Sequence, residues 1–180
     1  HYFCSVYASR MMVKNKKGLI VNISSPGGLK YLFDVAYGIG KAGVDRMATD
    51  MAVELKDSNI TVVSVWPGGV RTQLVVNGIE KGAFGKEGSI FEDYETQEYA
   101  GKGIAALAAD PNKFAKTGRI LTTADMGDIY NFTDLNGRRP PNMRSLSAIL
   151  VWAGWKQAAG WIPRWINVPG WMLYAAASPL

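Results

Sequence analysis

Two continuous apolar runs, joined by a long amphipathic stretch, set the fold that this chain can adopt. The runs Leu19–Ile23 and Ile60–Trp66 are short and rich in branched residues, which is typical of strands covered on both faces of a parallel sheet. Between them, apolar residues recur at the spacing of one helix face, at Val44, Met47, Ala48, Met51 and Leu55. Strand, helix and strand in this order predict a right-handed parallel crossover and therefore an α/β fold.

Three polar side chains lie where the first run gives way to the helix. Ser25 follows the predicted strand, and Tyr37 and Lys41 are four residues apart. A helix that begins near Tyr37, with Asp34 as its candidate cap, places the phenol and the ammonium on one face. A phenol has a reference pKa of about 10 and gives up its proton poorly at neutral pH, but a neighbouring ammonium favours the phenolate. Together with a hydroxyl, this pair is suited to general acid–base catalysis on a carbonyl or an alcohol. Ser24 is the alternative to Ser25, although in an extended chain it faces the other side of the sheet.

A second motif extends this interpretation. The next strand runs into Pro67 and Gly68, and the segment continues to Thr72. The sequence N-I-S-S, followed by Y-x-x-x-K and then by this Pro-Gly segment, resembles the active-site signature of the short-chain dehydrogenase/reductase family. The resemblance extends over most of the chain, and its most specific motifs lie between Asn22 and Thr72. The loop and the Trp-rich C-terminal part resemble one subgroup of the family in particular.

The resemblance implies a role for each of the three polar side chains. Tyr37 is expected to be the general acid/base, Lys41 to favour the phenolate and bind the nicotinamide ribose, and Ser25 to hold the substrate oxygen. The family's fold is a doubly wound parallel sheet, a Rossmann-like domain, and nothing before Leu19 can supply its N-terminal dinucleotide-binding half. We therefore expect the C-terminal part of such a domain, inactive by itself and an enzyme as the full-length protein.

The same resemblance predicts the cofactor and the substrate. Pro67 and Gly68 let the backbone approach the cofactor closely, and Val70 and Thr72 are expected to contact the carboxamide end of the nicotinamide. A plain loop or cap hydroxyl is the alternative for Thr72. The subgroup implies NADP(H) more than NAD(H), a hydrophobic substrate such as a steroid or xenobiotic carbonyl or alcohol, and a location at the endoplasmic reticulum membrane or in the cytoplasm. The alternative function is a catalytically incomplete product that acts as an interaction or membrane-binding module.

A literal G-x-G-x-x-G motif, from Gly38 to Gly43, is not expected to bind a dinucleotide. The phosphate-binding fingerprint needs a strand that runs directly into its first glycine. Here the apolar run ends near Ile23, and Tyr37 precedes Gly38. We expect these glycines to allow close packing of the helix instead.

The stretch after the Pro-Gly segment has weaker signals. Residues 72–95 are rich in Gly, Lys and Glu without a clear period, which predicts a long loop; in the family this position is the substrate-binding flap. Residues 96–109 are predicted to be helical, and residues 117–121 resemble the family's last strand. Residues 123–127 then depart from the usual family ending, and Asp125 and Asp128 are expected on a solvated loop.

The chain changes character at Ser145, which divides a catalytic part, residues 1–144, from a C-terminal segment, residues 145–180. Five of the six tryptophans lie in this segment, interrupted by Lys156 and Arg164, and no run reaches the ~20 apolar residues of a membrane-spanning helix. The pattern suits a segment that lies in a membrane interface. A segment that packs on its own domain, or on a partner subunit in a homo-oligomer, to close the substrate pocket fits equally well.

Composition argues against several other functions. The single cysteine, Cys4, cannot form an internal disulfide or a Cys-rich metal site, and no carboxylate cluster has metal-site spacing. The Lys and Arg residues behind the net charge of +5 are scattered and have no aromatic residues between them, so we expect no nucleic-acid partner. The only histidine is His1, which argues against a Ser-His-Asp hydrolase.

Overall fold

The structure is a computed structural model that describes residues 1–83, 95–152, 155–163 and 165–177. Within these residues, parallel strands form a sheet in the order β1-β2-β3, with bounds Gly18–Ile23, Ile60–Trp66 and Ile120–Thr122. The register pairs Gly18 with Ile60 at one end of β1 and Ile23 with Val65 at the other. The predicted α/β fold with a parallel sheet is therefore confirmed.

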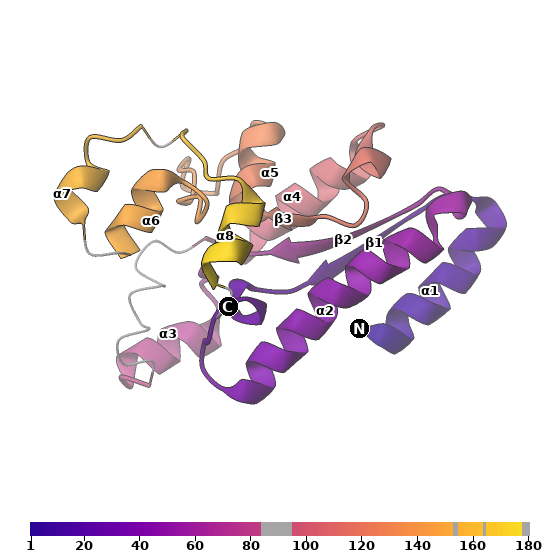
Figure 1. Ribbon diagram of the computed structural model, residues 1–180, viewed down its shortest axis with the longest axis horizontal. Coiled ribbons are helices and arrows are strands. Elements are labelled where there is room, and N and C mark those ends of the chain that lie inside the picture. Colours follow the sequence, from indigo (N-terminus) through magenta and orange to yellow (C-terminus); the bar gives the residue numbers. More distant parts are fainter. Residues whose placement is uncertain (84–94, 153–154, 164, 178–180) are drawn as a thin grey trace.

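Helices cover both faces of the sheet (Figure 1). One face carries α1, Tyr2–Asn15, and α2, Val35–Glu54, and the other carries α4, Gln97–Ala109, and α5, Thr123–Ile129. Every residue of β2 is buried, which explains why its apolar run does not alternate. Its side chains divide between two cores: Ile60 and Val62 pack on the α2 side, and Val63 and Val65 pack on the α4 side.

The stretch at 72–95 contains a helix that the sequence pattern did not indicate. α3, Gln73–Glu80, begins after Thr72, whose hydroxyl accepts a hydrogen bond from Val75 N over 3.2 Å. Its apolar residues follow helical spacing, but a helix of two turns contains too few repeats to be recognised. The rest of the stretch, which is rich in Gly, Lys and Glu, hides the pattern further. The loop prediction is wrong for residues 73–80, and the part of the predicted flap at 84–94 lies outside the described residues.

The third strand begins later than predicted. The 3-10 helix η4, Lys113–Lys116, leads into Thr117, whose Oγ1 accepts a hydrogen bond from Val62 N over 3.0 Å. This contact turns the chain onto β2 before strand pairing starts at Ile120. α5 follows β3 without a break, so the loop that was expected to carry Asp125 and Asp128 is a helix.

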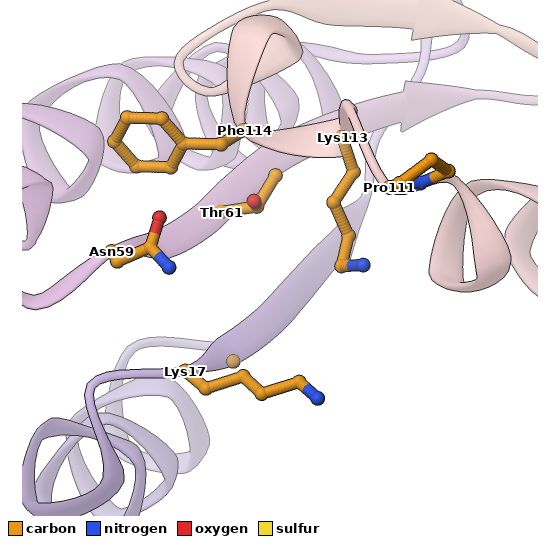
Figure 2. Close-up of a pocket in the computed structure, with 7 residues that line it drawn as sticks. Lys17, Asn59, Thr61, Pro111, Lys113 and Phe114 are labelled. Carbon is orange, nitrogen blue, oxygen red and sulfur yellow. The ribbon is translucent and has the colours of Figure 1, made fainter.

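A cavity opens at the edge of the sheet where the strands begin. Its volume is about 270 Å³, and Figure 2 shows Lys17 and Lys113 reaching it from opposite sides. The starts of β1 and β2 and the helix η4 line it, with Lys17, Gly18, Asn59, Thr61, Lys113 and Phe114. Ligands of open parallel sheets bind beyond the carboxyl ends of the strands. This cavity therefore lies at the edge opposite to the predicted site.

The C-terminal segment forms short helices beyond the carboxyl ends of β1 and β2 (Figure 1). These are α6, Leu146–Trp152, α7, Lys156–Ala159, and α8, Gly170–Ala177. An antiparallel bridge between Ser145 and Asn167 closes the segment on itself. None of the described helices has the length and apolar character needed to cross a bilayer.

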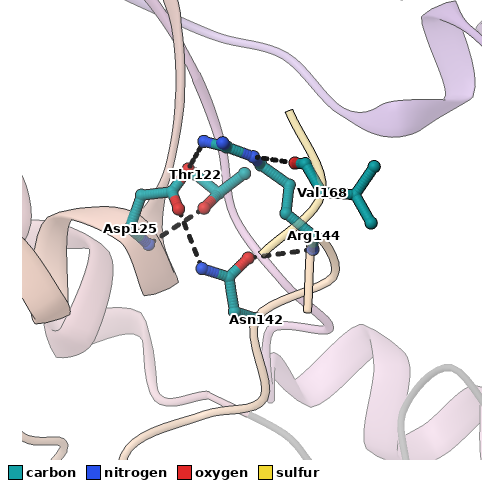
Figure 3. Close-up of polar contacts among 5 residues, drawn as sticks. All are labelled: Thr122, Asp125, Asn142, Arg144 and Val168. Carbon is teal, nitrogen blue, oxygen red and sulfur yellow. Dashed lines mark hydrogen bonds and ion pairs between the residues drawn. The ribbon is translucent and has the colours of Figure 1, made fainter. Parts of the chain in front are cut away.

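Arg144 joins this segment to α5 (Figure 3). Its Nη1 forms an ion pair with Asp125 Oδ2 at 2.8 Å, and its Nε donates to Val168 O over 3.2 Å. Asn142 Nδ2 donates to the other oxygen of Asp125 over 2.8 Å, and Thr122 Oγ1 accepts from Asp125 N over 3.0 Å. Asp125 therefore carries a structural contact between β3, α5 and the C-terminal segment rather than a solvated surface.

Candidate active site

Ser25 and Tyr37 meet at the carboxyl end of β1. The Tyr37 hydroxyl donates a hydrogen bond to Ser25 Oγ over 2.9 Å. Ser25 is buried and Tyr37 is half-buried. Lys41 lies beside them, with its Nζ 5.6 Å from the centroid of the Tyr37 ring and 3.4 Å from Ile23 O. The structure thus brings the hydroxyl, the phenol and the ammonium together, while their catalytic roles stay a prediction.

Two helix caps fix the positions of Ser25 and Tyr37. Ser25 Oγ also accepts a hydrogen bond over 2.9 Å from Gly27 N, in the 3-10 helix η1, Pro26–Gly28. Asp34 Oδ1 accepts a hydrogen bond from Tyr37 N over 2.7 Å, so Asp34 caps α2, as predicted. The Phe33 ring meets the Tyr37 ring edge to face at a centroid distance of 5.1 Å. The two caps and the Phe33 ring together hold the Tyr37 phenol against Ser25.

The two neighbouring serines have different surroundings. The Ser24 hydroxyl donates to the backbone carbonyl of Lys41 over 3.0 Å, and Ser24 N donates to Val65 O over 2.8 Å. Ser24 therefore ties the end of β1 to α2 and β2. Its side chain is engaged with the helix backbone, and the hydroxyl that meets Tyr37 belongs to Ser25.

Two glycines that the sequence did not single out allow this approach. A Cβ on Gly27 would lie 2.4 Å from Tyr37 Cε1, and a Cβ on Gly28 would lie 2.7 Å from the backbone N of Ala42. Real Cβ atoms do not approach this closely, so η1 packs on α2 only because both positions lack a side chain. The close-packing role was expected instead for the glycines of α2, but Gly40 has no atom within 4 Å of such a Cβ, and the same is true of Gly43. That expectation is wrong for these two positions.

Asp45 fastens α2 to the sheet below the site. Its carboxylate accepts hydrogen bonds from Ser64 Oγ over 2.5 Å and from Trp66 Nε1 over 3.0 and 3.1 Å. Asp45 lies one turn after Lys41, so the bonds fix the rotation of the helix that carries Tyr37 and Lys41. A hydrophobic pattern could not indicate this acidic residue, because its partners lie on a strand about twenty residues later.

The predicted cofactor-binding segment leaves the sheet at the same edge. The pairing of Ile23 with Val65 places the residues after β1 and after β2 side by side. Pro67, Gly68, Val70 and Thr72 all lie in the segment after β2, and all are half-exposed. Thr72 is the N-cap of α3, which is the alternative role considered for it. A cap hydroxyl does not exclude a contact with a cofactor, and the binding roles of the four residues stay predictions.

A sequence model described as short chain dehydrogenase matches residues 1–81, which contain β1, β2 and the Ser25–Tyr37–Lys41 group. The chain belongs to the short-chain dehydrogenase/reductase family. Dehydrogenase/reductase SDR family member 1 of Homo sapiens is 41% identical over 182 aligned residues, which cover 96% of this chain and 58% of that protein. The Mus musculus protein of the same name is 40% identical over the same shares. The predicted similarity to this subgroup is confirmed, and the chain spans about 58% of the length of these relatives.

Solved structures agree with the fold. ElxO with NADP bound is 35% identical with a TM-score of 0.59, and the match covers 71% of this chain and 53% of that chain. 4-hydroxyisoleucine dehydrogenase complexed with NADH is 26% identical with a TM-score of 0.53, over 67% and 51% of the two chains. The Rossmann-like assignment is therefore confirmed by family and by structure.

Proposed function

We propose that the whole protein is an oxidoreductase that interconverts a carbonyl and an alcohol with NADP(H). The observation that carries this proposal is the hydrogen bond from the Tyr37 hydroxyl to Ser25 Oγ beside the Lys41 ammonium. The family membership supplies the class of reaction, and these three groups supply the means of moving a proton. The activity is proposed for the whole protein because the chain spans 58% of the human relative's length.

The chain's own residues carry out the proton step. Ser25 Oγ holds the substrate oxygen next to the Tyr37 hydroxyl, which gives a proton when a carbonyl is reduced and takes one when an alcohol is oxidised. The Lys41 ammonium, 5.6 Å from the Tyr37 ring centroid, stabilises the phenolate that remains after the proton is given. The nicotinamide, when bound, supplies or accepts the hydride.

The residues around the site fit the nicotinamide end of a dinucleotide. A lysine ammonium has three donors, and among the described residues the acceptor of Lys41 Nζ is Ile23 O, so donors are left for ribose hydroxyls. The segment from Pro67 to Thr72 offers half-exposed backbone at the same edge. ElxO carries NADP and 4-hydroxyisoleucine dehydrogenase carries NADH in their structures. The higher identity of ElxO supports NADP(H) as the cofactor.

The proposed substrate is a hydrophobic carbonyl or alcohol, of steroid or xenobiotic size. Its support is the position of the apolar C-terminal helices beyond the carboxyl ends of β1 and β2 (Figure 1), where a substrate of the site would lie. The subgroup similarity supports a location at the endoplasmic reticulum membrane or in the cytoplasm.

A panel of carbonyl compounds tests this function directly. The whole protein, incubated with NADPH and hydrophobic ketones and aldehydes, is expected to consume NADPH with at least one of them. We expect kcat/KM to be roughly ten-fold higher with NADPH than with NADH, a difference of about 1.4 kcal/mol in transition-state stabilisation. Reactions without the carbonyl compound are the control. Consumption that does not depend on any member of the panel would contradict the proposal.

A second function, binding to a membrane surface, is favoured by the C-terminal part. Residues 135–180 contain five Lys or Arg residues and neither Asp nor Glu, whereas residues 1–134 contain fifteen of each sign. The whole net charge of +5 therefore resides in this part. Four of its tryptophans are between 66% and 89% exposed, namely Trp155, Trp161, Trp165 and Trp171. Exposed tryptophan beside unbalanced positive charge is suited to the interface of an anionic bilayer.

Vesicle sedimentation tests the membrane proposal. The whole protein is expected to bind phosphatidylcholine vesicles that contain phosphatidylserine more tightly than pure phosphatidylcholine, since each cation near an anionic surface contributes about 1 kcal/mol. Replacing Trp161 and Trp165 by Ala should weaken binding several-fold. The matched control is the replacement of Tyr2 and Tyr7, two exposed aromatic residues of α1. Equal binding of both double variants would count against the C-terminal segment as the membrane contact.

Self-association stays a prediction. The apolar side chains of α1 that support it are between 63% and 76% exposed, namely Tyr2, Phe3, Tyr7 and Met11. Such a face is of the kind that a second copy of a chain can cover.

A further inference from the structure

Glu95 is a buried carboxyl group at the carboxyl ends of β2 and β3. Its main chain pairs with the turn after β2, since Glu95 N donates to Gly69 O and Arg71 N donates to Glu95 O, each over 2.9 Å. Its side chain accepts a hydrogen bond from Thr123 Oγ1 over 2.6 Å, and its Oε2 lies against Gly68, where a Cβ would be 3.1 Å away. One residue therefore fastens the turn from Gly68 to Arg71 to the residue that follows β3.

The burial of this carboxyl group opposes its charge. Glu95 is 1% exposed, and its Oε1 has no hydrogen-bond partner among the described residues. Burial raises the pKa of Glu95 to about 6, against the hydrogen bond from Thr123 and the nearby backbone N–H of Gly68, and the nearby charge of Asp134 raises it further. Burying a carboxylate costs free energy unless both its oxygens find partners, and groups with raised pKa values in such surroundings are concentrated at functional sites.

Among the described residues, two other titratable groups face Glu95, and neither changes its charge near neutral pH. Burial raises the pKa of Tyr99, on α4, to about 12, so its hydroxyl stays neutral. Although burial opposes it, hydrogen bonds from Thr96 hold the pKa of Asp134 below its usual value, so that carboxyl stays ionised. Of these three groups, Glu95 is therefore the one that changes its charge near pH 6.

We propose that Glu95 is a positioning residue for the cofactor-binding segment, whose carboxyl group and main chain hold Gly68 to Arg71 in the form that receives the nicotinamide end of the cofactor. The inference rests on the proposed function, which puts the cofactor against Pro67–Thr72. Val70, one of the residues expected to touch the nicotinamide, pairs directly with Glu95 in a parallel bridge. Hydrogen bonds to an ionised acceptor are about twice as strong as those to a neutral one. The hold is therefore strongest when Glu95 has lost its proton.

Hydrogen exchange at the Arg71 amide, which donates to Glu95 O, measures this hold without any cofactor. In the whole protein, Glu95→Ala is expected to speed exchange at Arg71 by about ten-fold or more, because the bridge loses the carboxyl group that ties it to Thr123. Glu95→Gln keeps one acceptor oxygen and should speed it less. Glu98→Gln, at an exposed glutamate in the first turn of α4, three residues after Glu95, is the matched control and should leave it unchanged. Equal exchange at Arg71 in Glu95→Ala and in the wild type would overturn the proposal.

Titration with NADPH adds a readout that a purely structural role would not move. The wild-type Kd for NADPH is expected to rise as the pH falls through about 6, whereas the Kd of Glu95→Gln lacks this step. Comparing the two proteins cancels any titration of the cofactor's own phosphate. A step of equal size in Glu95→Gln would also overturn the proposal. If the wild type binds no NADPH, the proposed function fails, and exchange at Arg71 still decides whether Glu95 holds the turn.

Discussion

Tyr37→Phe in the whole protein is expected to lower kcat by roughly 10²- to 10⁴-fold, the usual contribution of one general acid–base group, while the Kd for NADPH changes little. The substitution removes one oxygen, which donates to Ser25 Oγ over 2.9 Å. It retains the ring that packs on Phe33 and lies beside Lys41. The loss should therefore fall on the chemical step and not on folding. Saturation kinetics with a substrate from the carbonyl panel give kcat, and fluorescence titration gives the Kd.

Tyr31→Phe is the matched control for this experiment. Tyr31 is 71% exposed and donates its hydroxyl to the backbone carbonyl of Phe33 over 3.2 Å, so it lies near the site without facing Ser25. Its loss should leave kcat within about two-fold, since exposed substitutions change little. A Tyr37→Phe protein with a kcat close to that of the wild type would refute the role of the phenol, even if the panel shows a reductase.

The parts of the fold that the sequence predicts well are those set by local pattern. Leu19–Ile23 and Ile60–Trp66 are continuous apolar runs. Apolar residues at successive positions are typical of a strand that is buried on both faces. The Tyr37–Lys41 spacing fixes a shared helix face whatever the rest of the chain does. These two features predict that Ser25, Tyr37 and Lys41 lie together.

The features that the sequence did not indicate depend on contacts between distant segments. Asp45 and Glu95 are acidic residues in buried positions, and their partners lie some twenty or more residues along the chain. A periodic pattern assigns an acidic residue to the surface, so it cannot identify a carboxylate that joins two elements. The ion pair of Arg144 and Asp125 is not predicted for the same reason, since the sequence around each residue is also that of an ordinary surface charge.

The glycines show most clearly what a sequence pattern cannot predict, because the motif around a glycine does not indicate whether that glycine packs closely in the structure. The motif from Gly38 to Gly43 attracts attention, yet a Cβ at Gly40 meets no atom within 4 Å. The adjacent pair Gly27 and Gly28 has no motif, yet both positions touch α2. Only the packing of η1 on α2 tells the two kinds of glycine apart, and that packing is a tertiary property.

Gly28→Ala and Gly40→Ala are therefore expected to change stability in opposite directions. At Gly28, a Cβ would lie 2.7 Å from Ala42 N and 2.8 Å from Lys41 C. Both atoms are backbone in the interior of a helix and cannot rotate away, so η1 must move off α2. Overpacking of this kind lowers the free energy of unfolding by about 1–3 kcal/mol. At the exposed Gly40, alanine meets no neighbour and favours the helix by up to about 1 kcal/mol.

The same displacement should reach the site. Ser25 caps η1, so moving η1 moves the oxygen that accepts the Tyr37 hydroxyl, and Gly28→Ala is expected to lower kcat as well as stability. Urea unfolding of the whole protein measures the stability change for both variants, and kcat with a substrate from the carbonyl panel measures the second effect. A Gly28→Ala protein as stable as Gly40→Ala would show that η1 does not rest on the helix backbone. Lost stability with unchanged kcat would instead show that the packing of η1 on α2 does not position Ser25. The Ser25 hydroxyl would then keep its hydrogen bond with Tyr37 even after η1 has moved.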